Sequence, residues 1–176
     1  MNRDPRRAIR FWLAIFITGL VLSGVTAFPL ETELRWTFSA LSTPSVQPFA
    51  QATHLLPWIA RVDHALSDTN AHYPFLAYGT DWLAFAHLVL AVLFLGPYRD
   101  PVRNKWVITF GLIACAGVIP LALIAGHIRG IPIAWRLIDC TFGIFGAIPL
   151  LRCQSLIASL EHSDQPARSE PSNHEP

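Results

Sequence analysis

The chain has 176 residues, of which 52% are hydrophobic and only 14% are charged, and its mean hydropathy is +0.40. This composition excludes an ordinary soluble domain, because such a domain needs a surface that water can wet. The net charge of +1 supplies no general basic field, which argues against nucleic acid as a partner. We therefore expect an all-α integral membrane protein.

The first apolar run follows a basic start and has the length of a membrane span. Residues 1–10 contain four arginines, and the apolar run covers 11–28. About 20 apolar residues cross the ~30 Å of hydrocarbon in a bilayer, so we expect a cytoplasmic N-terminus and then the first span. The pattern also resembles a signal peptide with a small-residue cleavage site at 25–27. The length of the run favours a retained span; cleavage would leave three spans and an external N-terminus.

Residues 29–80 are expected to form an external loop with helices of its own. Apolar side chains recur there at helical spacing in two places, first at Leu34, Phe38 and Leu41 and then at Trp58 or Ile59, Val62 and Leu66. This spacing predicts two short amphipathic helices that lie on the bundle or membrane surface. The letters SDTN at 67–70 predict a turn.

Three further spans are predicted after this loop. They cover residues 82–98, 106–126 and 131 to about 151. In the cytoplasmic connection 99–105, Asp100 is placed to cap the next helix. Pro120 lacks an amide hydrogen and is expected to bend the third span. The four spans form an antiparallel bundle within a membrane domain of 11–160, and the polar segment 161–176 is predicted to be a disordered cytoplasmic tail.

Basic residues are distributed unequally between the two sides of this arrangement. Nine Lys and Arg residues lie on the side of the termini, against four on the other side. Because cytoplasmic loops carry an excess of Lys and Arg, both termini are expected in the cytoplasm. An even number of spans agrees with this orientation.

The fourth predicted span carries charged and small residues on one face. Arg136, Asp139, Gly143, Gly146 and Leu150 follow one another at intervals of three or four. Small residues let helices approach closely, and charges inside a membrane usually face other helices. The stripe is therefore expected to point inward.

Five ionisable residues are predicted to form a buried polar site near the external face: His87, Arg136, Asp139, Asp81 and His127. In one interpretation they are structural: Arg136 and Asp139 pair within their helix, and His87 donates to a carbonyl or to Asp139 and so orients the second and fourth spans. In the other they line an externally open pocket, where His87 relays a proton or binds a metal and Arg136 holds an anion. No metal-ligand or haem spacing is present, so no cofactor is indicated by a motif.

Two stretches carry a family resemblance. YGTDWLAFAHLVLAVLFLGPYRDPVRNKWV and the later IRGIPIAWRLIDCTFG resemble small bacterial four-span inner-membrane proteins that have no assigned activity. The resemblance covers about residues 73–151 and implies a location in the bacterial inner membrane. It implies no catalytic residues.

The expected function is that of a non-enzymatic accessory or scaffold protein. Its partners would be the lipid bilayer and other membrane subunits or further copies of itself. The alternative is a ligand-, metal- or proton-handling membrane protein, related to transport or redox chemistry, that uses the polar layer. An enzyme acting on lipid or quinone is a third alternative, but no nucleophile or acid–base pair with recognisable spacing supports it.

Overall fold

The computed structural model describes residues 4–163, and these residues form helices and turns without a strand. Four helical stretches are long and apolar enough to cross a membrane: Pro5–Ala27, Pro74–Arg99, Lys105–Ile128 and Ile133–His162. Four such stretches were expected, and each overlaps its predicted span. The predicted all-helical fold is confirmed for the described residues. Arg3 and most of the predicted tail, residues 164–176, lie outside them.

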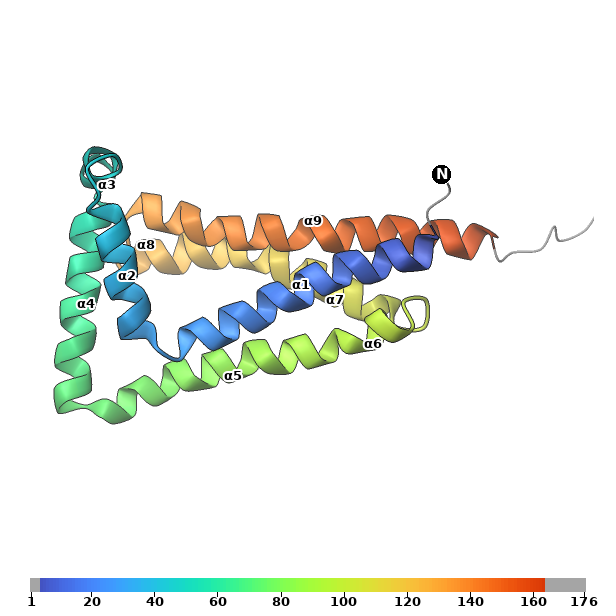
Figure 1. Cartoon of the computed structure of the whole chain (residues 1–176), viewed down its shortest axis with the longest axis horizontal. Coiled ribbons are helices and arrows are strands. Elements are labelled where there is room, and N and C mark those ends of the chain that lie inside the picture. The colour runs from blue at the N-terminus through green and yellow to red at the C-terminus, as the bar shows by residue number, and fades with distance from the viewer. Residues whose placement is uncertain (1–3, 164–176) are drawn as a thin grey trace, which may run out of the picture.

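Helix α1 (Pro5–Ala27) is the central long helix of the structure. It begins with Asp4, whose side chain accepts a hydrogen bond from the amide of Arg6 at 3.0 Å, and with Pro5 in its first turn. α1 packs against both α5 (Tyr78–Leu93) and α9 (Ile133–Ser163), which belong to different long stretches. Figure 1 shows α1 running diagonally between them.

The third long stretch changes its helical form partway along. Helix α7 (Lys105–Pro120) is followed by a π-helical turn (Leu121–Ala125) and then by α8 (Gly126–Ile128). Pro120 supplies no amide hydrogen to the helix, and the wider turn begins directly after it, as is common where a helix is locally unwound. α7 lies along α9 for most of its length.

The segment between the first two long stretches forms a helical layer across one end of the structure. It contains α2 (Leu30–Leu41), α3 (Gln47–Ala52), α4 (Leu55–His72) and a 3₁₀ turn (Pro74–Ala77). α2 and α4 contact each other and lie across the long helices (Figure 1). The two amphipathic helices are confirmed, although α4 is longer than expected.

The turn predicted at 67–70 is wrong, because these residues continue α4. Residues such as Ser, Asp and Asn favour turns by bonding to nearby backbone groups, but contacts made elsewhere can override this preference. Asn70 instead donates its side-chain amide to Glu31 of α2 at 2.6 Å. The tertiary contact between α2 and α4 therefore stabilises helix where the local sequence predicted a break.

The apolar core lies toward the end where α1 begins and α9 ends. The fully buried members of this core come from α1, α7 and α9, with Phe94 following α5; they are Ile9, Leu13, Ile108, Leu150, Cys153 and Ile157. We call this part the terminal half, and the part beside α2 and α4 the capped half. The core contains only apolar side chains, so close packing holds the terminal half together.

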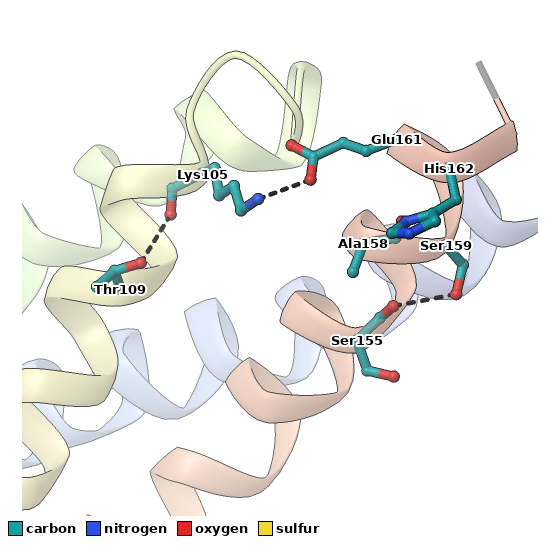
Figure 2. A network of polar contacts seen from close by, with 7 residues as sticks. All are labelled: Lys105, Thr109, Ser155, Ala158, Ser159, Glu161 and His162. Atoms are coloured by element: carbon teal, nitrogen blue, oxygen red, sulfur yellow. Dashed lines mark hydrogen bonds and ion pairs between the residues drawn. The ribbon is translucent and has the colours of Figure 1, made fainter. Parts of the chain in front are cut away.

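The connection between α5 and α7 departs from its predicted capping. A short helix α6 (Leu95–Arg99) follows α5, and Asp100 then accepts a hydrogen bond from the amide of Arg103 at 3.1 Å. Helix α7 begins only at Lys105, so Asp100 closes the preceding turn and does not cap the helix. Lys105 Nζ lies 2.6 Å from Glu161 Oε2. This contact, drawn in Figure 2, joins the start of α7 to the end of α9.

Candidate functional site

The small residues of α9, which the sequence predicted to point inward, face α7. A Cβ atom added at Gly143 would lie 2.5 Å from the carbonyl oxygen of Cys115, and one at Gly146 would lie 3.0 Å from the sulfur of the same cysteine. Leu150, further along the stripe, is completely buried. The stripe is therefore the contact surface that brings the backbones of α7 and α9 together.

Arg136 uses its side chain to hold the unwound part of the third stretch. Its Nη1 donates to the carbonyl oxygen of Leu123 at 3.2 Å, inside the π-helical turn. Its methylene groups cover Gly126, where an added Cβ atom would lie 2.6 Å from Cδ of Arg136. A backbone carbonyl in a locally unwound helix needs a donor when no water reaches it, and the guanidinium supplies one. Arg136 thus joins α9 to the preceding helical stretch through a hydrogen bond and a packing contact.

The predicted ion pair between Arg136 and Asp139 is not formed. Among residues 4–163, ion pairs involve other acidic and basic groups, and none includes Asp139 or Arg136. The physical reason is that the guanidinium reaches across to Leu123 and not along its own helix. Nε of Arg136 is buried and has no hydrogen-bond partner within the described part of the chain.

His87 is also occupied by its own helix. Its Nδ1 lies 2.8 Å from the carbonyl oxygen of Leu83, one turn earlier in α5. A carbonyl oxygen can only accept, so Nδ1 carries the hydrogen in this contact. Of the two partners predicted for His87, the structure shows a carbonyl and not Asp139, because α5 packs against α1 and α1 lies between α5 and α9.

The five predicted site residues therefore do not come together. Arg136 adjoins Gly126, the neighbour of the exposed His127, whereas His87 and Asp81 lie on α5 beyond α1. His87 and Asp81 are six residues apart, and six residues of α-helix correspond to about 1.7 turns, so these two side chains do not share a face. Within residues 4–163, no group of three or more His, Cys, Asp or Glu side chains is arranged to hold a metal ion.

Of the five residues, Asp81 lines a surface hollow of about 260 Å³. The hollow lies where the end of α1 and the start of α2 meet α4 and the start of α5. We call it the corner hollow; its lining residues that bear on the chemistry are Glu31, Thr32, Asn70, Thr80 and Asp81, with Phe28, Leu30 and Leu66 among its apolar walls.

Of the polar residues that line the corner hollow, the sequence predicted only Asp81 as a site residue, and Glu31 and Asn70 are among those that it missed. They are 39 positions apart and meet through the Asn70–Glu31 hydrogen bond. Glu31 precedes the first predicted amphipathic helix, and Asn70 fell in the turn predicted at 67–70, so the sequence pattern placed neither residue on a predicted helix. The pattern did not reveal that the two helices pack against each other.

No protein-family model, characterised protein or solved structure matches this chain. The family resemblance carried by residues 73–151 therefore stays a prediction. The function must be argued from the contacts within the chain itself.

Proposed function

We propose that this chain is a non-enzymatic, multi-pass protein of the bacterial inner membrane that serves as an accessory or scaffold subunit. The observation that supports this is the apolar surface left uncovered on the four long stretches. In each of the first three stretches, only 17% of an apolar segment of 18 residues is buried inside the chain, and in the fourth stretch 28% is buried. Apolar surface of this extent needs lipid or another protein against it.

The use of the polar side chains supports a structural role. His87 and Arg136 both donate to backbone carbonyls, and Lys105 pairs with Glu161 between two helices. These contacts hold an antiparallel transmembrane bundle together.

The proposed orientation places both termini in the cytoplasm. α1 begins and α9 ends at the same end of the structure, where the connection between α6 and α7 also lies (Figure 1). Arginines 6, 7, 10, 99 and 103 and Lys105 gather in these segments. The excess of basic residues on cytoplasmic segments supports this assignment.

Reporter fusions test the orientation. A fluorescent protein fused after residue 176 should fluoresce, and alkaline phosphatase inserted between α2 and α3 should be active, because it matures only outside the cytoplasm. The reversed pattern would contradict the proposed topology. If alkaline phosphatase fused after residue 176 were active as well, the result would contradict an even number of spans.

Native mass measurement tests the scaffold role. The tagged chain, extracted from its own membranes in mild detergent, should run as part of a complex larger than one chain. His87→Asn should keep the complex while lowering stability slightly, since within residues 4–163 the hydrogen bond of His87 goes to the carbonyl oxygen of Leu83 in its own helix. A single chain without a partner would contradict the scaffold proposal. A stoichiometric metal or haem, found by elemental analysis or an optical spectrum, would contradict it as well.

One observation favours the alternative of ligand handling. It is the corner hollow, whose lining includes the carboxyl-bearing residues Asp81 and Glu31.

A further inference from the structure

The face of α9 that contacts α1 is covered by α1 along only part of its length. In the terminal half, the thiol of Cys153 donates to the carbonyl oxygen of Ile9 at 3.7 Å. Further along the same two helices, a Cβ atom added at Gly146 would lie 3.5 Å from Cε2 of Phe16. Seven residues of α9 thus correspond to seven residues of α1, so the two helices run side by side in opposite directions through this region.

Toward the capped half, α1 turns away from α9 and packs against α5. A Cβ atom added at Gly24 of α1 would lie 2.9 Å from the carbonyl oxygen of Ala84 and 3.0 Å from Cδ2 of Leu88, and both of these residues belong to α5. Figure 1 shows α1 and α9 close together where α1 begins and apart beside the layer of α2 and α4. The first turns of α9 therefore lie away from α1.

The face of α9 that binds α1 continues into these first turns. Phe142 precedes Cys153 by eleven residues, about three helical turns, and Asp139 precedes Gly146 by seven, about two turns. The side chain of Cys153 is 0% exposed, whereas that of Phe142 is 67% exposed. The change in exposure along one helix face marks where α1 stops covering α9. We call the uncovered continuation, formed by Trp135, Asp139 and Phe142, the open face.

The open face contains a carboxylate without a partner. Within residues 4–163, Asp139 forms no ion pair and accepts no hydrogen bond. The guanidinium of Arg136, one turn earlier, donates to Leu123 in the third stretch. Asp139 lies six residues, or ~9 Å, from the start of α9, inside a stretch that is apolar and long enough to cross a membrane. Ionisable side chains at such depth pair with other polar groups or face water, so this carboxylate needs a donor that the described residues do not supply.

Two properties of the open face fit a helix that carries a positive charge. The face continues an interface that already binds a helix, because Cys153 and Gly146 on the same face pack against α1. Lipid tails can cover Phe142 but have no hydrogen-bond donor for Asp139. Lys and Arg supply charge-assisted hydrogen bonds to carboxylates, which are among the stronger ones. A helix with one basic side chain therefore satisfies both the apolar and the charged part of the face.

We propose that the open face docks a transmembrane helix of another membrane protein, and that this helix carries a Lys or Arg at the level of Asp139. The basic side chain donates to the carboxylate of Asp139, and the apolar surface of the partner helix packs against Phe142. The inference rests on the proposed membrane location and deepens the accessory role, because it names the kind of partner and the surface that receives it.

Synthetic single-span peptides test the docking. The full chain, labelled at its C-terminus, is placed in phosphatidylcholine vesicles with a labelled Leu–Ala helix that has a single Lys at the level of Asp139. Resonance energy transfer should rise saturably with peptide and should indicate association about tenfold tighter than for the same peptide with Leu or Glu in place of Lys. The Leu peptide measures apolar packing alone, and the Glu peptide places like charges together.

Variants of the chain locate the contact. Asp139→Asn should weaken binding of the Lys peptide about tenfold, because it removes the charge and keeps nearly the same side-chain volume. Phe142→Ala should weaken it less. Two matched controls should bind the Lys peptide unchanged: Asp81→Asn removes a charge from α5, and Leu137→Ala removes an exposed apolar side chain from the other side of α9. Circular dichroism and the unfolding midpoint of every variant separate a lost contact from a lost fold.

Three results would overturn the proposal. The Lys peptide could bind no more tightly than the Leu peptide, or folded Asp139→Asn could bind it unchanged. Differently labelled copies of the chain could also associate through Asp139, which would make the open face a contact between copies. Failure of the proposed function appears elsewhere, in reversed reporter fusions or in a single chain on native mass measurement, so the two failures are distinguishable.

Discussion

The terminal half and the capped half of the structure are built from the same long helices but hold together differently. In the terminal half, apolar side chains such as Leu13, Ile108 and Leu150 are completely buried. In the capped half, buried apolar side chains such as Ile59 are accompanied by polar contacts between segments, as for Arg136 with Leu123 and Asn70 with Glu31. The comparison teaches that apolar packing contributes to both halves, while the capped half also depends on polar contacts between segments that are far apart in the chain.

The largest expected effect comes from emptying the terminal core. Leu150→Ala should lower the free energy of unfolding by about 3 kcal/mol, because it removes a completely buried side chain and leaves a cavity. Leu66→Ala in the capped half should cost about 1 kcal/mol or less, since Leu66 is partly exposed beside a hollow that already exists. Unfolding in mixed micelles, followed by circular dichroism, measures both. Equal losses would remove the distinction between the two halves.

The next effect concerns the contact between α7 and α9. Gly143→Ala should destabilise by about 2 kcal/mol, because its Cβ atom would meet the backbone oxygen of Cys115 and the helices would have to separate. Gly117→Ala is the control, since an added Cβ atom there meets nothing within 4 Å. The same unfolding assay applies. A neutral Gly143→Ala would show that the helices can move apart without cost.

A smaller effect is expected from removing the hydrogen bond between Arg136 and Leu123 in the capped half. Arg136→Met should cost about 1–2 kcal/mol, because the carbonyl of Leu123 loses its donor while much of the packing over Gly126 is kept. Asp139→Asn should change stability by less than about 0.5 kcal/mol, since Asp139 makes no ion pair within the described residues. If the two substitutions cost the same and are not additive, the pairing of Arg136 with Asp139 would be restored as the better account.

The smallest effect is expected from the ion pair in Figure 2. Lys105 and Glu161 are both partly exposed, at 43% and 35% of their side chains, so their coupling should be about 0.5 kcal/mol and should weaken in salt. A double-mutant cycle with Lys105→Met and Glu161→Gln, at low and high salt, measures it. A coupling above about 2 kcal/mol that salt leaves unchanged would place a major stabilising contact outside the terminal core.

Local pattern predicted much of the fold and little of the site. The spans follow from apolar run length, and the inward stripe through Gly143 follows from its helical spacing. The positions of His87 and Asp139 along their predicted spans suggested that both lie at the same level, near the external face of the membrane. Position along a helix does not say which helices are neighbours. The insertion of α1 between α5 and α9 separates them. The pairing of Asn70 with Glu31 likewise joins residues that no local pattern connects.

The sequence by itself determined four long apolar helices, two amphipathic ones and the faces on which small residues gather. These features depend on hydropathy and on the 3.6-residue period, which act over a few turns of chain. Only the tertiary structure decided the partner of Arg136, the separation of the predicted site residues and the formation of the corner hollow. The physical reason is that each of these depends on which helices lie side by side, and that choice rests on contacts between residues far apart in the chain.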